Sequence, residues 1–373
     1  MKVAIVGAGI LGLAHAYVAS RKGHTVEVFE RSLRANGASI RNFGMIWPIG
    51  QPSGEMHEMS LRSRQLWQEV LTDARLPYFA TGSLHVVYRE DEATVAREFS
   101  ELAPSLGYEC EWLPPDKVLS RSQALIADGL IGALWSPTEL TVDPRQTVCT
   151  LPSFLEKNYG VRFHFGCAAQ AIEPPKVVAG SREWEADCAI VCNGDDFETL
   201  FPTLFAASGI TRCKLQMMRT PAQPDGWSLG PSLAAGLTLR FYPAFHVCST
   251  LDILKQRIAE ETPQYDRWGI HVLVSQTARG ELTLGDSHEY GLAINIFNKT
   301  EVDELVLAYA RKFLRAPDMS IAERWYGVYA KHHDAPFVHL TPVKDVHIVT
   351  AAGGSGMTLA FGLAERTIRE AGL

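Results

Sequence analysis

The chain has 373 residues, of which 46% are hydrophobic and 21% are charged. These fractions are typical of globular proteins, and the length suggests two domains or one large domain with an inserted lobe; a disordered, collagen-like or coiled-coil chain is excluded. With 35 basic and 42 acidic residues, the formal net charge of −7 gives no electrostatic footprint for nucleic acid. Seven cysteines without a CxxC pair favour a reducing compartment, so we expect a cytoplasmic protein.

Residues 3–20 are almost continuously apolar and resemble a membrane-spanning segment or a signal peptide in length. They contain three glycines at a fixed spacing, however, and their first residues read as a strand. No other segment is long and apolar enough to span a bilayer. We therefore expect no membrane span.

The N-terminal residues form the pattern strand, glycine-rich turn, helix, strand. A buried strand over residues 1–6 precedes Gly7-Ala8-Gly9-Ile10-Leu11-Gly12, which matches GxGxxG, and a second strand is predicted over residues 25–29. This order is typical of dinucleotide binding: Gly7 allows the tight turn, Gly9 lets the backbone approach a pyrophosphate, and Gly12 lets the helix pack closely. The N–H groups at the start of the helix would face the phosphates.

Glu30 ends the second strand and would accept hydrogen bonds from a ribose diol. Its carboxylate would repel a 2′-phosphate, which argues against NADP. The motif alone does not distinguish NAD from FAD.

The next segments favour FAD. Arg31 follows the acid, and the stretch Ala38-Ser39-Ile40-Arg41-Asn42-Phe43-Gly44-Met45-Ile46-Trp47-Pro48 mixes small residues with amide and hydroxyl donors. This stretch resembles the flavin-contacting loop of the D-amino acid oxidase, glycine oxidase and sarcosine oxidase family. The resemblance implies that the cofactor is FAD, that Arg31 lies near it, and that the flavin is surrounded by Ser39, Arg41, Asn42, Gly44 and Met45.

The resemblance extends through almost the whole chain. It implies that the strand near Ala169 passes the adenine end of FAD, and that Asn193-Gly194, after an apolar strand, makes a further contact. A strand over residues 346–352 leads into Gly353-Gly354-Ser355-Gly356-Met357-Thr358 and a helix to residue 365. In the family this turn faces the flavin pyrimidine, where a positive helix dipole would stabilise negative charge on the reduced ring.

The same resemblance predicts an α/β fold, in which a Rossmann-like FAD-binding domain is interleaved with an α+β substrate domain on a mainly antiparallel sheet, as in glycine oxidase. We expect residues 1–80, 141–210 and 321–373 in the FAD-binding domain and residues 81–140 and 211–320 in the substrate domain. Within the latter, the apolar patterns predict strands over residues 237–241 and 271–275 and a helix over residues 302–314.

These flavoenzymes remove a hydride from a carbon that bears an amine. A W-x-G-x-R-P segment carries the arginine that holds a substrate carboxylate; here Trp325 and Gly327 match, but Tyr329 stands in place of the arginine. We therefore expect the substrate to meet a different set of donors, and we name no catalytic base and no metal ligand. The expected substrate contacts are Tyr329, Lys331 and His332, with Arg240 and Tyr242 as weaker candidates.

In monomeric sarcosine oxidase a cysteine holds FAD covalently at the position that Gly327 occupies here, so we expect non-covalent FAD. That enzyme also has a lysine where Thr283 stands, so the electron acceptor is oxygen or another molecule.

Together, residues 39–48, 325–331 and 353–357 resemble a bacterial branch associated with aminophosphonate breakdown. The resemblance implies a small, anionic amine as substrate, such as a derivative of 2-aminoethylphosphonate with an N-methyl or 1-hydroxy group. Alternatives are a glycine, sarcosine or D-amino acid oxidase or dehydrogenase, a 2-hydroxy acid oxidase, and a flavin-binding protein without turnover.

Overall fold

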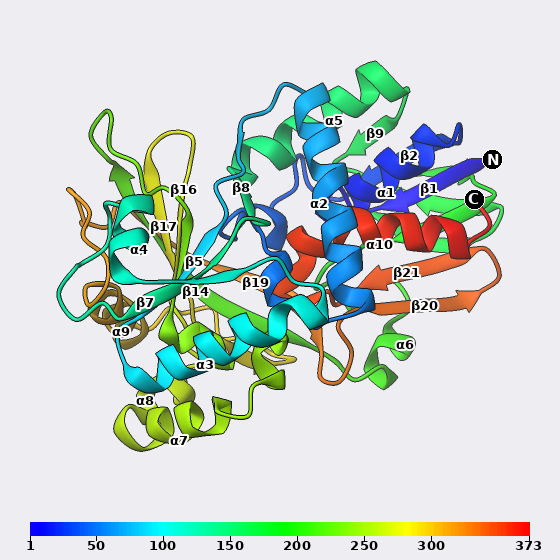
Figure 1. Cartoon of the computed structure of the whole chain (residues 1–373). Coiled ribbons are helices and arrows are strands. Elements are labelled where there is room, and N and C mark those ends of the chain that lie inside the picture. The colour runs from blue at the N-terminus through cyan, green and yellow to red at the C-terminus, as the bar shows by residue number, and fades with distance from the viewer.

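A computed structural model describes residues 1–373 and is organised around two sheets (Figure 1). The smaller sheet has six strands, and all neighbouring pairs are parallel except β20 with β21. Its order is β20 (Val338–Val343), β21 (Val346–Thr350), β13 (Cys188–Val191), β1 (Lys2–Val6), β2 (Thr25–Glu30) and β9 (Arg162–Phe165). Its central strands are buried on both faces, as their apolar sequences predict.

Helices cover one face of this sheet. Helix α1 (Ile10–Arg21) packs against α10 (Gly356–Glu370) and α5 (Pro144–Tyr159), and α10 packs against α2 (Glu55–Asp73). The close packing of α1 follows from its small residues, because Gly12, Ala14 and Ala16 are buried. A three-stranded antiparallel sheet, β10 (Ala169–Glu173), β11 (Lys176–Ala179) and β12 (Arg182–Glu185), contributes to a further apolar cluster with strands β1, β13 and β21.

The larger sheet has nine strands and forms the other side of the molecule (Figure 1). All its pairs are antiparallel except β15 with β5. The strand order is β18 (Glu289–Gly291), β14 (Ile210–Ala222), β17 (Glu281–Gly285), β16 (Leu273–Gln276), β15 (Ser232–Ala235), β5 (Ser83–Val87), β7 (Gly132–Ser136) and β6 (Glu111–Leu113), with β19 (Glu323–His332) also on β14.

The remaining elements are short or peripheral. A small sheet connects the two halves, and its strands are β3 (Met45–Ile46), β8 (Leu140–Val142) and β4 (Tyr78–Phe79). The other helices are α3 (Glu90–Leu102), α4 (Pro115–Arg121), α6 (Pro202–Ala207), α7 (Leu251–Glu261), α8 (Pro263–Arg267) and α9 (Thr300–Ala310). No helix combines the length and the apolar character needed to cross a bilayer.

Three predicted elements differ from the structure. The predicted strand over residues 237–241 is wrong: residues 236–240 form a 3-10 helix, η4 (Gly236–Arg240), because the chain turns into the core and buries Leu237 and Leu239 together. The helix predicted over 302–314 ends at Ala310, where Phe313 and Leu314 instead pair with residues 125 and 126. The strand predicted over residues 271–275 begins only at Leu273.

Strand β19 joins the two halves of the fold. It pairs with β14 over its whole length, from Ile210 opposite His332 to Arg219 opposite Glu323. At its far end Lys331 forms an isolated bridge with Ala352, just after β21. This strand therefore lies between the larger sheet and the C-terminal turn of the smaller sheet. The division into two domains by residue range remains a prediction.

Candidate functional site

A cavity of about 930 Å³ lies between the two sheets. The ends of β1, β2 and β13, the loop after β2, strand β19 and the turn before α10 all contribute to its wall. It brings together most of the residues that the sequence singled out: Gly7, Gly9, Ile10, Leu11, Glu30, Arg31, Ser39, Arg41, Asn42, Met45, Ala169, Asn193, Gly194, Tyr242, Tyr329, Lys331, His332, Gly354, Ser355, Gly356, Met357 and Thr358.

The turn between β1 and α1 depends on glycine for steric reasons. Gly7 has φ +99°, and a Cβ there would lie 2.3 Å from the carbonyl oxygen of Cys192. A Cβ at Gly12 would lie 1.9 Å from the carbonyl oxygen of Gly7, so a glycine here allows the helix to pack closely against the turn. Gly12 itself does not line the cavity. Both positions match the close packing expected of a dinucleotide-binding turn.

The start of α1 offers free donors to the cavity. The Ile10 amide donates to Ser39 Oγ at 2.9 Å, and the Leu13 amide donates to the Gly9 carbonyl. The amides of Leu11 and Gly12 have no partner, and the first turn carries no acidic side chain. These groups and the helix dipole fit a phosphate.

Glu30 lies at the end of β2, where its carboxylate organises the surrounding backbone. Its two oxygens accept hydrogen bonds from the amides of Ala8 and Ser32, each at 2.9 Å. Each oxygen keeps a further lone pair for a ribose hydroxyl. Nearby, Arg31 forms an ion pair with Asp196 at 2.8 Å across the same end of the cavity.

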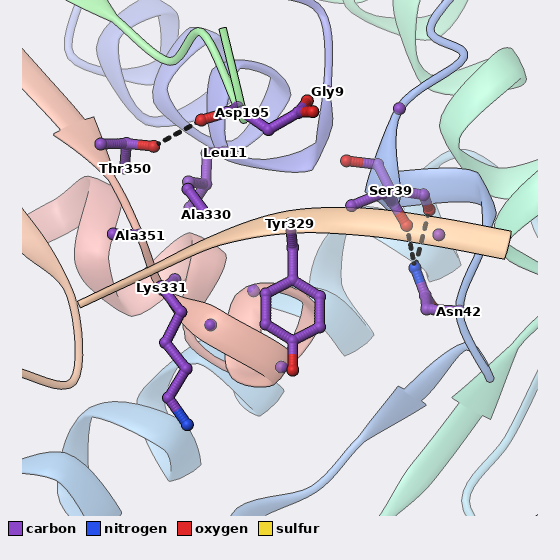
Figure 2. A pocket seen from close by; sticks show the side chains of 18 of the residues that line it. Gly9, Leu11, Ser39, Asn42, Asp195, Tyr329, Ala330, Lys331, Thr350 and Ala351 are labelled. Atoms are coloured by element: carbon purple, nitrogen blue, oxygen red, sulfur yellow. Dashed lines mark hydrogen bonds between the residues drawn. The ribbon is translucent and has the colours of Figure 1, made fainter. Parts of the chain in front are cut away.

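The loop after β2 is held in shape by Asn42 (Figure 2). The Asn42 amide donates to the carbonyl oxygens of Ala38 and Ser39, at 2.9 and 3.0 Å, and its Oδ1 accepts from the Gly44 amide. Gly44 has φ +73° and no room for a Cβ beside Val142, so it shapes the loop from outside the cavity wall. Asn42 thus stabilises the loop that forms this part of the cavity wall.

The C-terminal turn is fixed to the rest of the wall by hydrogen bonds. Thr350 Oγ1 donates to the Gly194 carbonyl at 2.9 Å, which ties the end of β21 to the end of β13 (Figure 2). Ser355 Oγ accepts from Gln51, and Thr358 Oγ1 accepts from the Trp47 amide. The turn that precedes α10 therefore presents its backbone to the cavity in a defined position.

Tyr329 and Lys331 project from the same face of β19, whereas Ala330 projects from the opposite face (Figure 2). A Cβ at Gly354 would lie 3.6 Å from Tyr329 Oη, so the phenol reaches the C-terminal turn. Burial raises the pKa of Tyr329 well above its ordinary value, and the phenol is a neutral hydrogen-bond donor. Lys331 Nζ has no hydrogen bond or ion pair and lies 5.4 Å from the centre of the Tyr290 ring.

The other predicted substrate contacts differ in their surroundings. His332 lines the cavity, but its Nδ1 accepts hydrogen bonds from the amides of Asp334 and Ala335, each at 3.0 Å. Tyr242 also lines the cavity, and burial raises the pKa of its phenol. The structure does not bring Arg240 to the cavity, because its guanidinium binds Asp266 and two backbone carbonyls instead.

The polar residues in the wall that the sequence does not single out include His271, Asp286 and His288. Asp286 Oδ1 lies 3.0 Å from His271 Nε2. Burial opposes ionisation of Asp286, but the charges of His271 and His288 hold its pKa below the usual value. Burial lowers the pKa of His288, and Asp286 partly offsets this effect. The feature of the sequence that could have indicated this cluster is the aspartate and the histidine, Asp286 and His288, directly after the apolar run of β17.

The wall fits a dinucleotide on several observations. The free amides at the start of α1 suit a pyrophosphate, Glu30 suits a ribose, and the buried Asn193 Oδ1 has no hydrogen-bond partner. The cavity volume falls within the range of about 300–1,000 Å³ that is usual for ligand sites. The second end of the cavity, around Tyr329 and His288, remains available for a small molecule.

Comparison with known proteins agrees with this fit. A family model described as FAD dependent oxidoreductase (DAO) matches residues 2–369. A D-amino acid dehydrogenase of Vibrio cholerae is 23% identical over 434 residues, covering 98% of this chain and 93% of that protein. A glycine oxidase of Geobacillus kaustophilus is 26% identical over 143 residues, which cover 36% of this chain and 38% of that protein.

The crystal structure of glycine oxidase from Geobacillus kaustophilus has the same fold. It superposes with a TM-score of 0.77 at 16% sequence identity, covering 99% of this chain and 95% of that chain. The predicted glycine oxidase-like fold is thereby confirmed.

Proposed function

The chain belongs to the DAO family of FAD-dependent oxidoreductases, and from this premise we propose that it oxidises a small amine that carries an anionic group. The observation that carries the proposal is the pair of donors on β19. Tyr329 and Lys331 face the same end of the cavity, and the Lys331 ammonium has no ion pair with the protein. An unpaired ammonium in a partly enclosed site favours an anionic ligand.

FAD would lie along the wall from Glu30 to the turn at Gly354, held by the contacts described above, and would supply the hydride acceptor. Loss of a hydride from the carbon next to nitrogen leaves an iminium ion. Water hydrolyses it to a carbonyl compound and ammonia or an alkylamine. Tyr329 and Lys331 would hold the anionic group and thereby direct the carbon–hydrogen bond toward the flavin.

The proposed anionic group is a phosphonate. A carboxylate is planar and is best held by two parallel bonds from arginine, but β19 presents Tyr329 at the position where the family's segment has that residue. A tetrahedral phosphonate suits separate donors that approach from different directions, such as a phenol and a movable ammonium. The proposed substrates are therefore 2-aminoethylphosphonate and its N-methyl or 1-hydroxy derivatives, which would give phosphonoacetaldehyde or a related product.

Anaerobic bleaching of bound FAD, followed at about 450 nm, tests the proposal directly. We expect rapid bleaching by an aminophosphonate and little by glycine, sarcosine or D-alanine. Two matched compounds separate the contributions of the anion: β-alanine replaces the phosphonate by a carboxylate, and 2-aminoethanol replaces it by a neutral group. Bleaching only by an amino acid would sink the phosphonate assignment, while leaving amine oxidation in place.

The same assay separates the alternatives. A glycine, sarcosine or D-amino acid oxidase or dehydrogenase would respond to those amino acids, and a 2-hydroxy acid oxidase would respond to hydroxy acids but not to amines. A flavin-binding protein without turnover would hold FAD that no small substrate bleaches. Reoxidation of the bleached protein by air, compared with an artificial dye, then distinguishes oxygen from another electron acceptor.

A further inference from the structure

The wall of the cavity contains a cluster of metal-ligating side chains at its substrate end. His271, Asp286 and His288 each direct one ligand atom into a common space, and these atoms all lie within 4.8 Å of one another. Two imidazoles and one carboxylate form a ligand set suited to divalent transition metals, with positions left open for another ligand. We propose that this cluster binds a divalent metal ion of the class of Zn²⁺.

The main chain holds the three residues in place. In the antiparallel pair of β16 and β17, Leu273 lies opposite Gly285, which brings His271 close to Asp286. The Asp286 amide donates to the His271 carbonyl at 2.9 Å, and the His288 amide donates to the Trp268 carbonyl at 2.8 Å. The positions of the three side chains are therefore set by backbone hydrogen bonds, as a preorganised ligand site requires.

Two of these side chains are buried with unsatisfied polar atoms. His271 and Asp286 are each only 5% exposed. Neither Asp286 Oδ1 nor His271 Nδ1 has a hydrogen-bond partner, although the aspartate oxygen lies 3.0 Å from the other ring nitrogen of His271. Leaving a buried polar atom unpaired costs about 1–3 kcal/mol. A cation shared by the imidazole and the carboxylate would remove part of this cost.

His288 already has the orientation of a metal ligand. Its Nδ1 lies 2.9 Å from the Gly269 carbonyl oxygen, to which it donates, so the lone pair resides on Nε2. Metal-bound histidines usually have such a second hydrogen bond. On the other side, the Phe241 ring stacks on His271 with 4.4 Å between ring centres, which restricts the rotation of that imidazole.

The separations suit one ion after a small adjustment. Ligands at about 2.0–2.2 Å from a common tetrahedral metal stand about 3.3–3.6 Å apart. The largest separation here is within 4.8 Å, so side-chain shifts that close the widest pair by up to about 1.2 Å would bring all three atoms to coordination distance.

The open coordination positions would face the cavity beside Tyr290 and Lys331. An anionic substrate oxygen would complete the coordination and would bind Lys331 at the same time. This part of the inference rests on the proposed function. The metal would act as an anchor for the anion and would take no part in the transfer of hydride.

Metal content tests the site without any substrate. The FAD-loaded protein, prepared without a histidine tag, is dialysed against a chelator, titrated with Zn²⁺ and analysed for bound metal. We expect one equivalent per chain, and a loss of affinity of at least about tenfold in each of Asp286→Ala and His288→Ala. His333→Ala is the matched control, because the His333 side chain is 93% exposed, and it should bind zinc as the parent protein does.

Unchanged flavin absorbance shows that the variants remain folded, and Co²⁺ supplies a second readout through its visible d–d bands. The proposal is overturned if the parent protein binds no stoichiometric zinc or cobalt, or if both alanine variants bind as tightly as the parent. Rapid bleaching by an aminophosphonate in a metal-free protein would reject the metal as the anchor of the anion and retain the proposed function. Stoichiometric metal binding together with bleaching by amino acids alone would retain the metal site and reject the phosphonate substrate.

Discussion

At the dinucleotide end of the cavity the groups that face a ligand are mainly backbone amides, such as that of Leu11, whereas at the substrate end they are side chains. The first set comes from one continuous turn. The second set comes from the hairpin of β16 and β17 and from β19, which lies almost forty residues further along the chain, with His271, Asp286 and Tyr329 on or beside these strands. Backbone recognition tolerates many side chains, so the substrate end is where a common fold acquires a particular substrate.

The largest expected effect is at the dinucleotide end, from Gly12→Val. A Cβ at this position would lie 1.9 Å from the Gly7 carbonyl oxygen, so the helix and the turn cannot both keep their places. We expect a loss of more than about 4 kcal/mol of stability and protein purified without FAD. Flavin absorbance and thermal unfolding measure both. A variant at Gly12 that retains FAD would contradict the steric argument.

A smaller effect is expected from Glu30→Ala. This change removes the acceptor for the amides of Ala8 and Ser32 as well as the proposed partner of the ribose. We expect FAD to bind about 30-fold more weakly, which corresponds to about 2 kcal/mol. Quenching of flavin fluorescence gives the dissociation constant. Glu30→Gln keeps one carbonyl acceptor, so its affinity for FAD should lie between that of the parent protein and that of Glu30→Ala. Equal affinity in all three proteins would show that Glu30 does not contact FAD.

Lowering the pH should destabilise the fold near both ends of the cavity, because each of these regions contains a buried histidine. Burial lowers the pKa of His85, behind Trp47 and Tyr242, to about 3 and that of His15, in α1, to about 4. The unfolded chain binds a proton below the ordinary value of 6.5, whereas the folded chain does not, so stability falls as pH falls from 6.5 toward these values. At pH 5 each histidine should cost about 2 kcal/mol.

His85→Leu removes one of these two contributions. Neither ring nitrogen of His85 has a hydrogen bond, so the change sacrifices no polar contact. We expect its melting temperature to fall less than that of the parent protein between pH 7 and pH 5. An exposed histidine, His333, serves as the control in His333→Leu. A parallel decline of all three melting temperatures would argue against the assigned protonation state of His85.

At the substrate end, Tyr329→Phe should change substrate binding and leave FAD in place. The variant loses the hydroxyl that reaches Gly354 but keeps the ring. We expect KM for the best substrate to rise about tenfold, which is about 1.4 kcal/mol, with an unchanged flavin spectrum. Steady-state kinetics with the substrate found by bleaching provides the measurement. An unchanged KM would remove Tyr329 from the substrate contacts.

The smallest effect is expected from Arg240→Lys, because this residue lies outside the cavity. Its guanidinium binds Asp266 and the carbonyls of Leu237 and Ile270, and a lysine keeps only part of these contacts. The melting temperature should fall by a few degrees, while KM stays within about twofold of the parent value. A large change in KM alone would show that Arg240 acts on the substrate after all.

The sequence predicts the dinucleotide end well because its signals are local. The strand, the glycine turn, the helix and Glu30 lie within thirty residues, and each glycine has a steric reason that any such turn would impose. Arg240 is only a weaker candidate from the sequence, and its partner Asp266, which keeps it from the cavity, lies 26 residues away. The cluster of His271, Asp286 and His288 depends on the pairing of β16 with β17, and periodicity does not reveal which strands are neighbours.

Apolar patterns in the sequence also predict the wrong backbone conformation where a segment is buried on every side. Residues 237–241 alternate in a way that fits a strand, yet Leu237, Thr238 and Leu239 are all buried as a short 3-10 helix. When both faces of a segment are covered, a periodic pattern no longer carries information about its backbone.

The packing of α1 against α10 has a consequence for folding during synthesis on the ribosome. Helix α1 leaves the ribosome early, but residues 356–370, which cover it, are made more than three hundred residues later. Strands β1 and β2 and helix α5, which also contact α1, are made earlier, but the part of its apolar surface that α10 covers stays exposed until then, and exposed apolar surface of this kind favours aggregation. Translation past residue 370, rather than the early completion of the glycine turn, therefore determines when this half of the molecule becomes able to fold.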